Sequence, residues 1–412
     1  MNRLRLIKIF QKTNARFFVV GALILVTSSC ALKWMDTIRY GSVGRTDFSE
    51  TIDVDIQNRL IFVPVQINGK TYRFLLDTGA PFSISKEIQT ALRYKKISKG
   101  HIVDSDFNRQ AVEVVQVDSL HIGTLPFLNQ TAFIGDFKAS PTLNCLHIDG
   151  ILGSNLIRHC NWVIDMENQK ITLTSRLEDW VKEEAKAIPF SADNQFDIML
   201  DMDAGASVIT NIKLDYGSNG GISLPENIFD KLEDKSGFEG VMIDRGTKQT
   251  GLVGKPVAFE RKSVIIDSVG FGSSRLNNIE IKTGKSGLLG TRFLSGFLVS
   301  IDWTSKQLYF KKYGMEPDPV STYGFLLGYT IEKGMYVQSV MDDSDAFHQG
   351  ITPNMTALKA DSLDFNSTHD FCDYIVLMRK APDTMHVLLQ NEEGDILPYK
   401  VSKTTLLTQK RY

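Results

Sequence analysis

The sequence repeats itself, and this repeat limits the folds open to the chain more than any other feature. Two segments align as FVPVQINGKTYRFLLDTGAPFSISKEI (residues 62–88) and FDIMLDMDAGASVITNIKLDYGSNGGISLPENI (residues 196–228), which matches Asp77 with Asp215. Each segment contains two strands of alternating hydrophobicity around a turn, followed by Asp-x-Gly. A duplicated hairpin of this kind predicts two similar halves in one chain.

Three further blocks match in the same order. They are residues 117–123 with 266–272, residues 151–157 with 288–294, and residues 163–173 with 300–310. Asp77 and Asp215 are 138 residues apart, and Asp165 and Asp302 are 137 residues apart. The constant order and spacing indicate two homologous lobes, which we predict at residues 31–185 and 186–314.

Both lobes are predicted to be rich in strands. Hydrophobic and polar residues alternate with a period of two, and Val, Ile, Phe and Thr fill these stretches. The one persuasive helical pattern near the lobes lies between them, at residues 176–187. We therefore expect an all-β body of two lobes.

Composition excludes several other classes of protein. The 412 residues include 46 Lys and Arg against 48 Asp and Glu, which argues against a nucleic-acid binder with a broad positive surface. Four Cys are too few for a miniprotein stabilised by disulfides. No apolar run outside the N-terminus reaches about 18 residues, so a protein with many membrane-spanning helices is excluded.

The N-terminus has the composition of an export signal. Basic residues without a single acid precede an apolar run of ten residues, Phe17–Val26, and small residues then lead into Cys30. The segment resembles the signal of bacterial lipoproteins, in which Cys30 would become the lipid-bearing first residue. The resemblance implies a signal at residues 1–30 and a membrane-anchored protein exported into the bacterial cell envelope. Cleavage without lipid and an uncleaved anchor are the alternatives.

The two Asp-x-Gly turns carry the chemistry. Asp77 and Asp215 each come directly after a strand, where a carboxylate is costly to bury unless it is paired or hydrogen-bonded. Gly79 and Gly217 let each turn approach another chain segment closely. If the lobes pack about a pseudo-twofold axis, the two carboxylates meet and share a proton. One is then a general base and the other a general acid on a bound water, which is machinery for amide hydrolysis.

These turns resemble those of the retropepsin-like aspartic proteases. The first turn is Asp77-Thr78-Gly79-Ala80 after apolar residues, and Ile151-Leu152-Gly153 matches the family's apolar-apolar-Gly segment beneath the active-site turn. Duplication within one chain is similar to the bilobed pepsin-type arrangement, and the resemblance covers about residues 50–314.

The resemblance implies two tandem acid-protease barrel lobes that hydrolyse peptides without a cofactor or metal ion. Asp77 and Asp215 would be catalytic. The residues that would shape and support the two turns are Thr78, Gly79, Ala80, Gly217 and Ser218.

The second turn departs from the family pattern at Tyr216, where the family has Thr or Ser. That hydroxyl forms a hydrogen bond across the lobe interface in the family, and here Thr78 can do so from one side only. The alternative interpretation is a pair of degenerate lobes whose buried Asp residues only cap turns. Asp203-Ala204-Gly205 looks more like the family's motif than the second turn does. The repeat alignment places it at a hairpin turn, so we predict no catalytic role for it.

The cysteines leave two interpretations open. Cys145 and Cys160 flank residues 151–153 in the first lobe, and either they form a disulfide, which an exported protein allows, or they are separate buried thiols. Together with His147 and His159 they match no zinc spacing, so we predict no metal site.

A different module follows a linker at residues 315–319, and we assign it to residues 315–408. The segment Tyr323-Gly324-Phe325-Leu326-Leu327-Gly328 precedes an expected strand at residues 335–340, a helix at residues 368–378 and a strand at residues 384–390. This order resembles a PDZ domain, whose loop receives a peptide C-terminus as an added strand. The resemblance implies that the backbone of Phe325, Leu326 and Leu327 binds the peptide. A packing domain without a ligand is the alternative.

The sequence therefore predicts an exported aspartic endopeptidase with a peptide-binding module and no nucleic-acid partner. The competing prediction is a catalytically inactive peptide-binding or scaffold protein of the cell envelope. Tyr216 distinguishes them: the enzyme is favoured if the two carboxylates come within hydrogen-bond range, and the binding protein if Tyr216 wedges the lobes apart.

Overall fold

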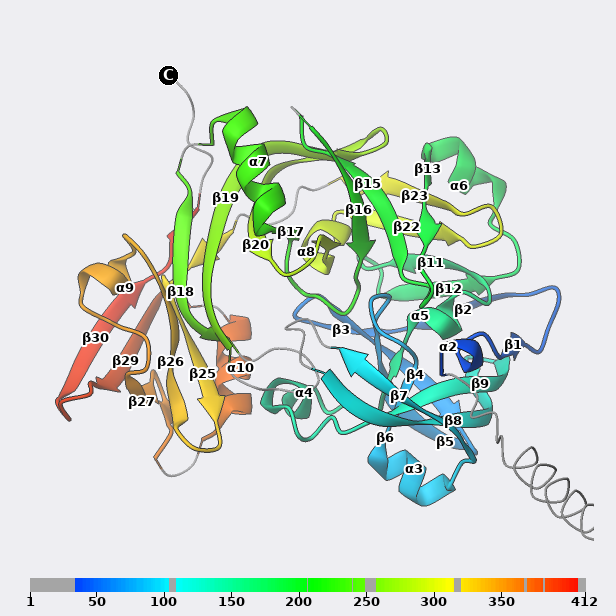
Figure 1. The fold of residues 1–412 in the computed structure, drawn as a ribbon, viewed down its shortest axis with the longest axis horizontal. Helices are drawn as coiled ribbons and strands as arrows, with labels where there is room; N and C mark the ends of the chain where they lie inside the picture. Colours follow the sequence, from blue (N-terminus) through cyan, green and yellow to red (C-terminus); the bar gives the residue numbers. More distant parts are fainter. Residues whose placement is uncertain are drawn as a thin grey trace, which may run out of the picture.

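The computed structural model describes residues 34–103, 109–205, 207–238, 240–248, 257–314, 320–366, 369–380 and 382–406. The body is mainly β, as predicted, with two lobes and a C-terminal module (residues 320–406) beside them (Figure 1). Among the described residues no helix is long and apolar enough to cross a membrane. Cys30 and the export signal predicted around it lie outside the described residues.

Lobe 1 runs from α2 to α6. Its elements are α2 (Trp34–Thr37), β1 (Ser42–Val43), β2 (Ser49–Asp53), β3 (Asp55–Gln57), β4 (Leu60–Ile67), β5 (Lys70–Leu76), β6 (Ser83–Ser85), α3 (Lys86–Leu92), β7 (Lys96–Val103), β8 (Arg109–Ile122), β9 (Leu125–Gly135), α4 (Pro141–Leu146), β10 (Gly150–Leu152), α5 (Ser154–Ile157), β11 (Asn161–Asp165), β12 (Lys170–Thr174) and α6 (Asp179–Glu184).

Lobe 2 runs from β13 to β23. Its elements are β13 (Ala187–Pro189), β14 (Ser191–Ala192), β15 (Ile198–Asp203), β16 (Val208–Leu214), β17 (Ile222–Pro225), α7 (Glu226–Ser236), β18 (Met242–Lys248), β19 (Val257–Phe271), β20 (Ser274–Gly284), β21 (Leu288–Leu289), α8 (Thr291–Leu294), β22 (Phe297–Asp302) and β23 (Gln307–Lys312).

The two lobes share one topology. In each, a hairpin (β4–β5 or β15–β16) leads into a short strand and a helix, and a later strand inserts in parallel beside the second hairpin strand. Leu152 of β10 lies opposite Leu76 of β5, and Leu289 of β21 lies opposite Leu214 of β16. These are equivalent positions in the sequence repeat, so the repeat corresponds to a repeated pattern of strand pairing.

The β4–β5 hairpin illustrates why these residues form strands. Val63, Val65 and Ile67 are buried while the intervening Pro64 and Gln66 are exposed, so one face of β4 covers the core. Asn68 and Gly69 follow with φ angles of 50° and 75°, the left-handed conformation of a two-residue hairpin turn.

A sheet shared by the lobes fixes their relative orientation. Its strand order is β13-β23-β22-β11-β12-β2, and β11 of lobe 1 pairs antiparallel with β22 of lobe 2. Val163 lies opposite Ser300, and these two residues are equivalent to each other in the repeat. A pseudo-twofold axis therefore passes through this pair. One hydrophobic core continues across both lobes around it.

The C-terminal module has a core of its own. Its elements are β24 (Ser321–Thr322), β25 (Phe325–Thr330), β26 (Gly334–Met341), α9 (Asp345–His348), β27 (Thr356–Ala360), β28 (Leu363–Asp364), α10 (Phe371–Lys380), β29 (Thr384–Gln390), β30 (Ile396–Ser402) and β31 (Thr404–Thr405). Strand β26 pairs with β18 of lobe 2, and α10 lies beside α4 of lobe 1 (Figure 1). The module is thus attached to both lobes.

Two predictions are wrong. The helix expected at residues 176–187 is shorter, because Ala187–Pro189 instead form β13, which pairs with the edge of β23 and buries Ile188. The disulfide joins Cys145 of α4 to Cys372 of α10, not to Cys160. Cys160 is a buried thiol in the shared core, where burial raises its pKa well above the usual value.

The disulfide can be tested by peptide mapping without reduction. After expression in an oxidising compartment, we expect a linked peptide pair that contains Cys145 and Cys372, and an alkylatable Cys160 after unfolding. A linked pair that contains Cys145 and Cys160 would contradict the structure.

Candidate active site

The two Asp-x-Gly turns meet at the lobe interface. Asp77 follows β5, and its N–H donates to the carbonyl of Leu152 at 3.0 Å; Asp215 follows β16, and its N–H donates to the carbonyl of Leu289 at 3.0 Å. Each carboxylate also accepts an N–H within its own turn, from Gly79 or Gly217, both at 2.9 Å. The turns are therefore built alike, and β10 and β21 support them in the same way.

The glycines of the turns allow the carboxylates to approach each other. A Cβ added to Gly79 would lie 2.9 Å from Cγ of Asp215, and one added to Gly217 would lie 2.3 Å from Cγ of Asp77. Each glycine therefore lies against the carboxylate of the opposite lobe. Asp77 and Asp215 are both partly exposed, so solvent can reach the pair.

Ala80 and Ser218 connect the two turns to the short helices α5 and α8. The carbonyl of Ala80 accepts the N–H of Ser154 at the start of α5, and the carbonyl of Ser218 accepts the N–H of Thr291 at the start of α8, both at 2.8 Å. The structure thus brings together the predicted residues of both turns. The look-alike Asp203 instead lies in the β15–β16 turn, as predicted, and forms an ion pair with Arg275.

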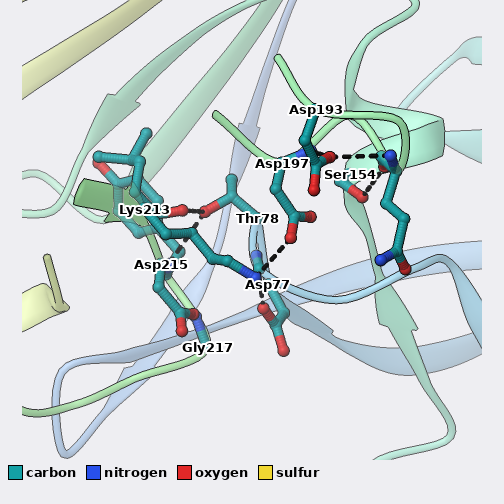
Figure 2. Close-up of polar contacts among 12 residues, drawn as sticks. Asp77, Thr78, Ser154, Asp193, Asp197, Lys213, Asp215 and Gly217 are labelled. Carbon is teal, nitrogen blue, oxygen red and sulfur yellow. Dashed lines mark hydrogen bonds and ion pairs between the residues drawn. The ribbon is translucent and has the colours of Figure 1, made fainter. Parts of the chain in front are cut away.

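The Thr78 hydroxyl of the first turn forms hydrogen bonds to the second turn. Its buried hydroxyl donates to the carbonyl of Leu214 at 2.6 Å and accepts the N–H of Tyr216 at 3.1 Å (Figure 2). This is the one-sided contact across the interface that the family resemblance implies.

Tyr216 occupies the position where the reciprocal hydroxyl would lie. Its side chain is fully buried in the shared core, and its hydroxyl has no hydrogen-bond partner among the residues that the structure describes. The phenol packs into the core and does not separate the two carboxylates.

The two carboxylates have raised pKa values. Burial raises the pKa of Asp77 well above its usual range, and the negative charge of Asp215 raises it further. Burial also raises the pKa of Asp215, against the lowering effect of the Lys213 ammonium. Two adjacent carboxylates in such a site retain one proton between them over a range of pH in which free carboxylates are ionised.

The sequence analysis missed a largely buried ion pair beside Asp77 and Asp215, the two carboxylates that we call the dyad. Nζ of Lys213 lies 2.5 Å from Oδ2 of Asp197, and Figure 2 shows the pair next to Asp77 and Asp215. Burial alone would lower the pKa of Lys213, but the charge and hydrogen bond of Asp197 outweigh it and the pKa is raised. The signal in the sequence is a lysine two residues before Asp215, where lobe 1 has Leu75.

The residues predicted to bind a peptide in the C-terminal module lie apart from the two Asp-x-Gly turns. Phe325, Leu326 and Leu327 begin β25, and Leu326 is exposed. The N–H of Leu327 donates to the hydroxyl of Tyr374 in α10 at 3.4 Å. Within the described part of the chain, His, Cys, Asp and Glu side chains form no group of three or more that could hold a metal ion.

Part of lobe 1 matches a known protein family. Residues 63–156, from β4 to α5, match the family model described as Aspartyl protease. No curated protein matches the chain. The match contains Asp77 and Gly153, and it ends before lobe 2, so lobe 1 holds an aspartyl protease domain and the equivalent role of Asp215 rests on the geometry.

The contact made by Thr78 is testable through stability. Thr78→Val removes two hydrogen bonds at the lobe interface and leaves a buried N–H and carbonyl without their partner, so we expect a loss of about 1–3 kcal/mol in unfolding free energy. Thr78→Ser keeps the hydroxyl and is the matched control. Equal midpoints for both variants in denaturant unfolding would contradict the role of the hydroxyl.

Removal of the Tyr216 hydroxyl, which has no partner among the described residues, is not expected to destabilise the fold. Tyr216→Phe removes a buried polar group that has no partner, so unfolding free energy should stay within about 0.5 kcal/mol of wild type or rise. Thermal and denaturant unfolding measure this directly. A loss above about 1 kcal/mol would mean that the hydroxyl has a partner after all.

Proposed function

We propose that this protein is an aspartic endopeptidase in which Asp77 and Asp215 together activate a water molecule to hydrolyse a peptide bond. The observation that carries the proposal is the placement of two carboxylates from equivalent turns, each against the glycine of the opposite turn. The aspartyl protease match of lobe 1 supports peptides as the class of substrate.

The chemistry follows from a dyad that holds one proton. The ionised carboxylate accepts a proton from water as the water oxygen attacks the carbonyl carbon, and the protonated carboxyl donates its proton to the carbonyl oxygen. The tetrahedral intermediate then collapses as the amine nitrogen takes a proton and leaves. This reaction uses no metal ion or organic cofactor.

The competing function is an inactive peptide-binding or scaffold protein. It requires that Tyr216 keep the carboxylates apart. The phenol lies in the core, and each carboxylate lies against the glycine of the opposite turn, which favours the enzyme.

The C-terminal module is proposed to receive a peptide C-terminus at Phe325, Leu326 and Leu327, on the basis of its resemblance to PDZ domains. A peptide that adds a strand to β25 would have to displace the Tyr374 hydroxyl from the N–H of Leu327. Export, and attachment to the cell-envelope membrane through a lipid on Cys30, are proposed on the sequence of the N-terminus alone.

The raised pKa values predict where the enzyme works. Activity requires a single shared proton, so it falls as pH rises through the pKa of Asp77 and as pH drops through that of Asp215. Because burial raises both pKa values above the ordinary carboxyl range, both limits should lie at higher pH than for free carboxylates.

The decisive experiment compares residues 31–412 as wild type, Asp77→Asn and Asp215→Asn on a diverse peptide pool from pH 3 to 8. Mass spectrometry of new termini should detect cleavage by wild type and a loss of at least about 100-fold in each variant, because each removes one half of the acid–base pair.

Asp203→Asn is the matched control, since it alters the look-alike turn outside the dyad and should retain cleavage. Absence of cleavage by folded wild type at every pH, or cleavage that survives in either dyad variant, would overturn the proposed function. In the first case, binding of peptides at β25 becomes the function to test.

A further inference from the structure

The two halves of the active site differ at one pair of equivalent positions. Leu75, two residues before Asp77, is buried in an apolar cluster with Phe62 and Ile151. Lys213, two residues before Asp215, is instead a charged side chain in an ion pair with Asp197. The duplicated fold therefore has an apolar side chain at this position in lobe 1 and a charged one in lobe 2.

Lys213 is held where its charge acts on the dyad. It lies near the end of β16, two residues before Asp215, and Figure 2 shows its side chain beside Asp77 and Asp215. The Lys213 side chain is 25% exposed and that of Asp197 is 6% exposed, so solvent screens their charges weakly.

The position of Asp197 is fixed by a short loop that touches lobe 1. Oδ1 of Asp193 accepts the N–H groups of Gln195 at 2.8 Å and Asp197 at 2.9 Å. Ser154, at the start of α5, donates its hydroxyl to the carbonyl of Gln195 at 2.7 Å (Figure 2). The ion pair is therefore anchored in both lobes, on the same helix that supports the Asp77 turn.

The two charges act unequally on the two members of the dyad. Among the described residues, the charged groups that act most strongly on it include Lys213 and Asp197, and Asp193 acts on Asp197. At Asp215 the ammonium of Lys213 outweighs the carboxylate of Asp197, and it lowers the pKa that burial has raised. At Asp77 the order is reversed, and the Asp197 carboxylate raises the pKa more than Lys213 lowers it. The pair thus acts as a dipole, with its positive end toward Asp215.

We propose that the Lys213–Asp197 pair polarises the dyad, so that the shared proton resides on Asp77 and Asp215 is the carboxylate that activates water. Lys213 and Asp197 are positioning residues for the proton. The role assignment rests on the proposed peptidase function; the polarisation itself does not.

The proton movements then follow a fixed order. A bond forms between the water oxygen and the carbonyl carbon, the water proton passes to Asp215, and the proton of Asp77 passes to the carbonyl oxygen. When the carbon–nitrogen bond breaks, its electrons remain with the nitrogen, which takes the proton from Asp215. Asp77 recovers a proton from a hydroxyl of the intermediate, and the resting state is restored.

The test uses a variant that removes the dipole without leaving a buried charge alone. Lys213→Met combined with Asp197→Asn replaces the ion pair with a neutral pair of similar size, whereas either change alone leaves an unpaired charge. Lys213→Arg keeps the charge and is the matched control. Circular dichroism and thermal unfolding establish that each variant is folded.

The first readout is the pH profile of kcat/KM. Without the dipole the pKa of Asp215 should rise and that of Asp77 should fall. The acidic midpoint of the profile should therefore move up, and the basic midpoint down, each by roughly half a pH unit or more. Lys213→Arg should leave both midpoints unchanged. A neutral double variant with lower kcat/KM but unchanged midpoints would overturn the proposal and assign the pair a structural role.

The second readout needs no activity. Carboxyl ¹³C chemical shifts, assigned with Asp77→Asn and Asp215→Asn, follow the titration of the dyad in the folded protein. We expect Asp77 to retain its proton to higher pH than Asp215, with a smaller gap between them in the neutral double variant. Equal titration in wild type, or the opposite order, would overturn the polarisation even if the peptidase activity is established. Absence of cleavage with the expected titration would overturn the peptidase function alone.

Discussion

The structure depends on the pairing of β11 with β22, which joins the lobes antiparallel about the equivalent residues Val163 and Ser300. Antiparallel pairing at equivalent residues generates a local pseudo-twofold axis. Equivalent elements of the two lobes are then related by this axis. The Asp-x-Gly turns lie near this axis, so two carboxylates that are costly to bury singly lie close together. Their proximity favours the retention of one proton by the pair, and the proposed hydrolysis depends on that proton.

Much of this architecture could be predicted, because the relevant signals are local or repeated. The duplicated hairpins follow from short patterns that recur at a constant spacing. The supporting role of β10 and β21 and the one-sided contact of Thr78 are implied by the resemblance to retropepsin-like proteases. The same alignment assigned Asp203 to a turn, where the structure has it. In the C-terminal module, β29 has the bounds expected from alternation alone, Thr384–Gln390.

The remaining features depend on contacts between distant segments, which no local pattern encodes. Cys145 pairs with a residue 227 positions away because α10 lies beside α4. Residues 187–189 have helical neighbours in sequence, but the free edge of β23 makes them a strand. Lys213 was visible as a charge in an apolar strand, yet its partner Asp197 is identified only by the fold of the loop that carries it.

The most direct test of the account is the affinity of a peptide in which a hydroxyl-bearing tetrahedral carbon replaces the cleaved amide. Such a group matches the intermediate that the dyad would stabilise, so wild type should bind it at least about 100-fold more tightly than the parent peptide. Asp77→Asn and Asp215→Asn should each abolish this preference. Equal affinity for the mimic and the parent peptide in folded wild type, or a preference that persists in both variants, would contradict a catalytic dyad at the lobe interface.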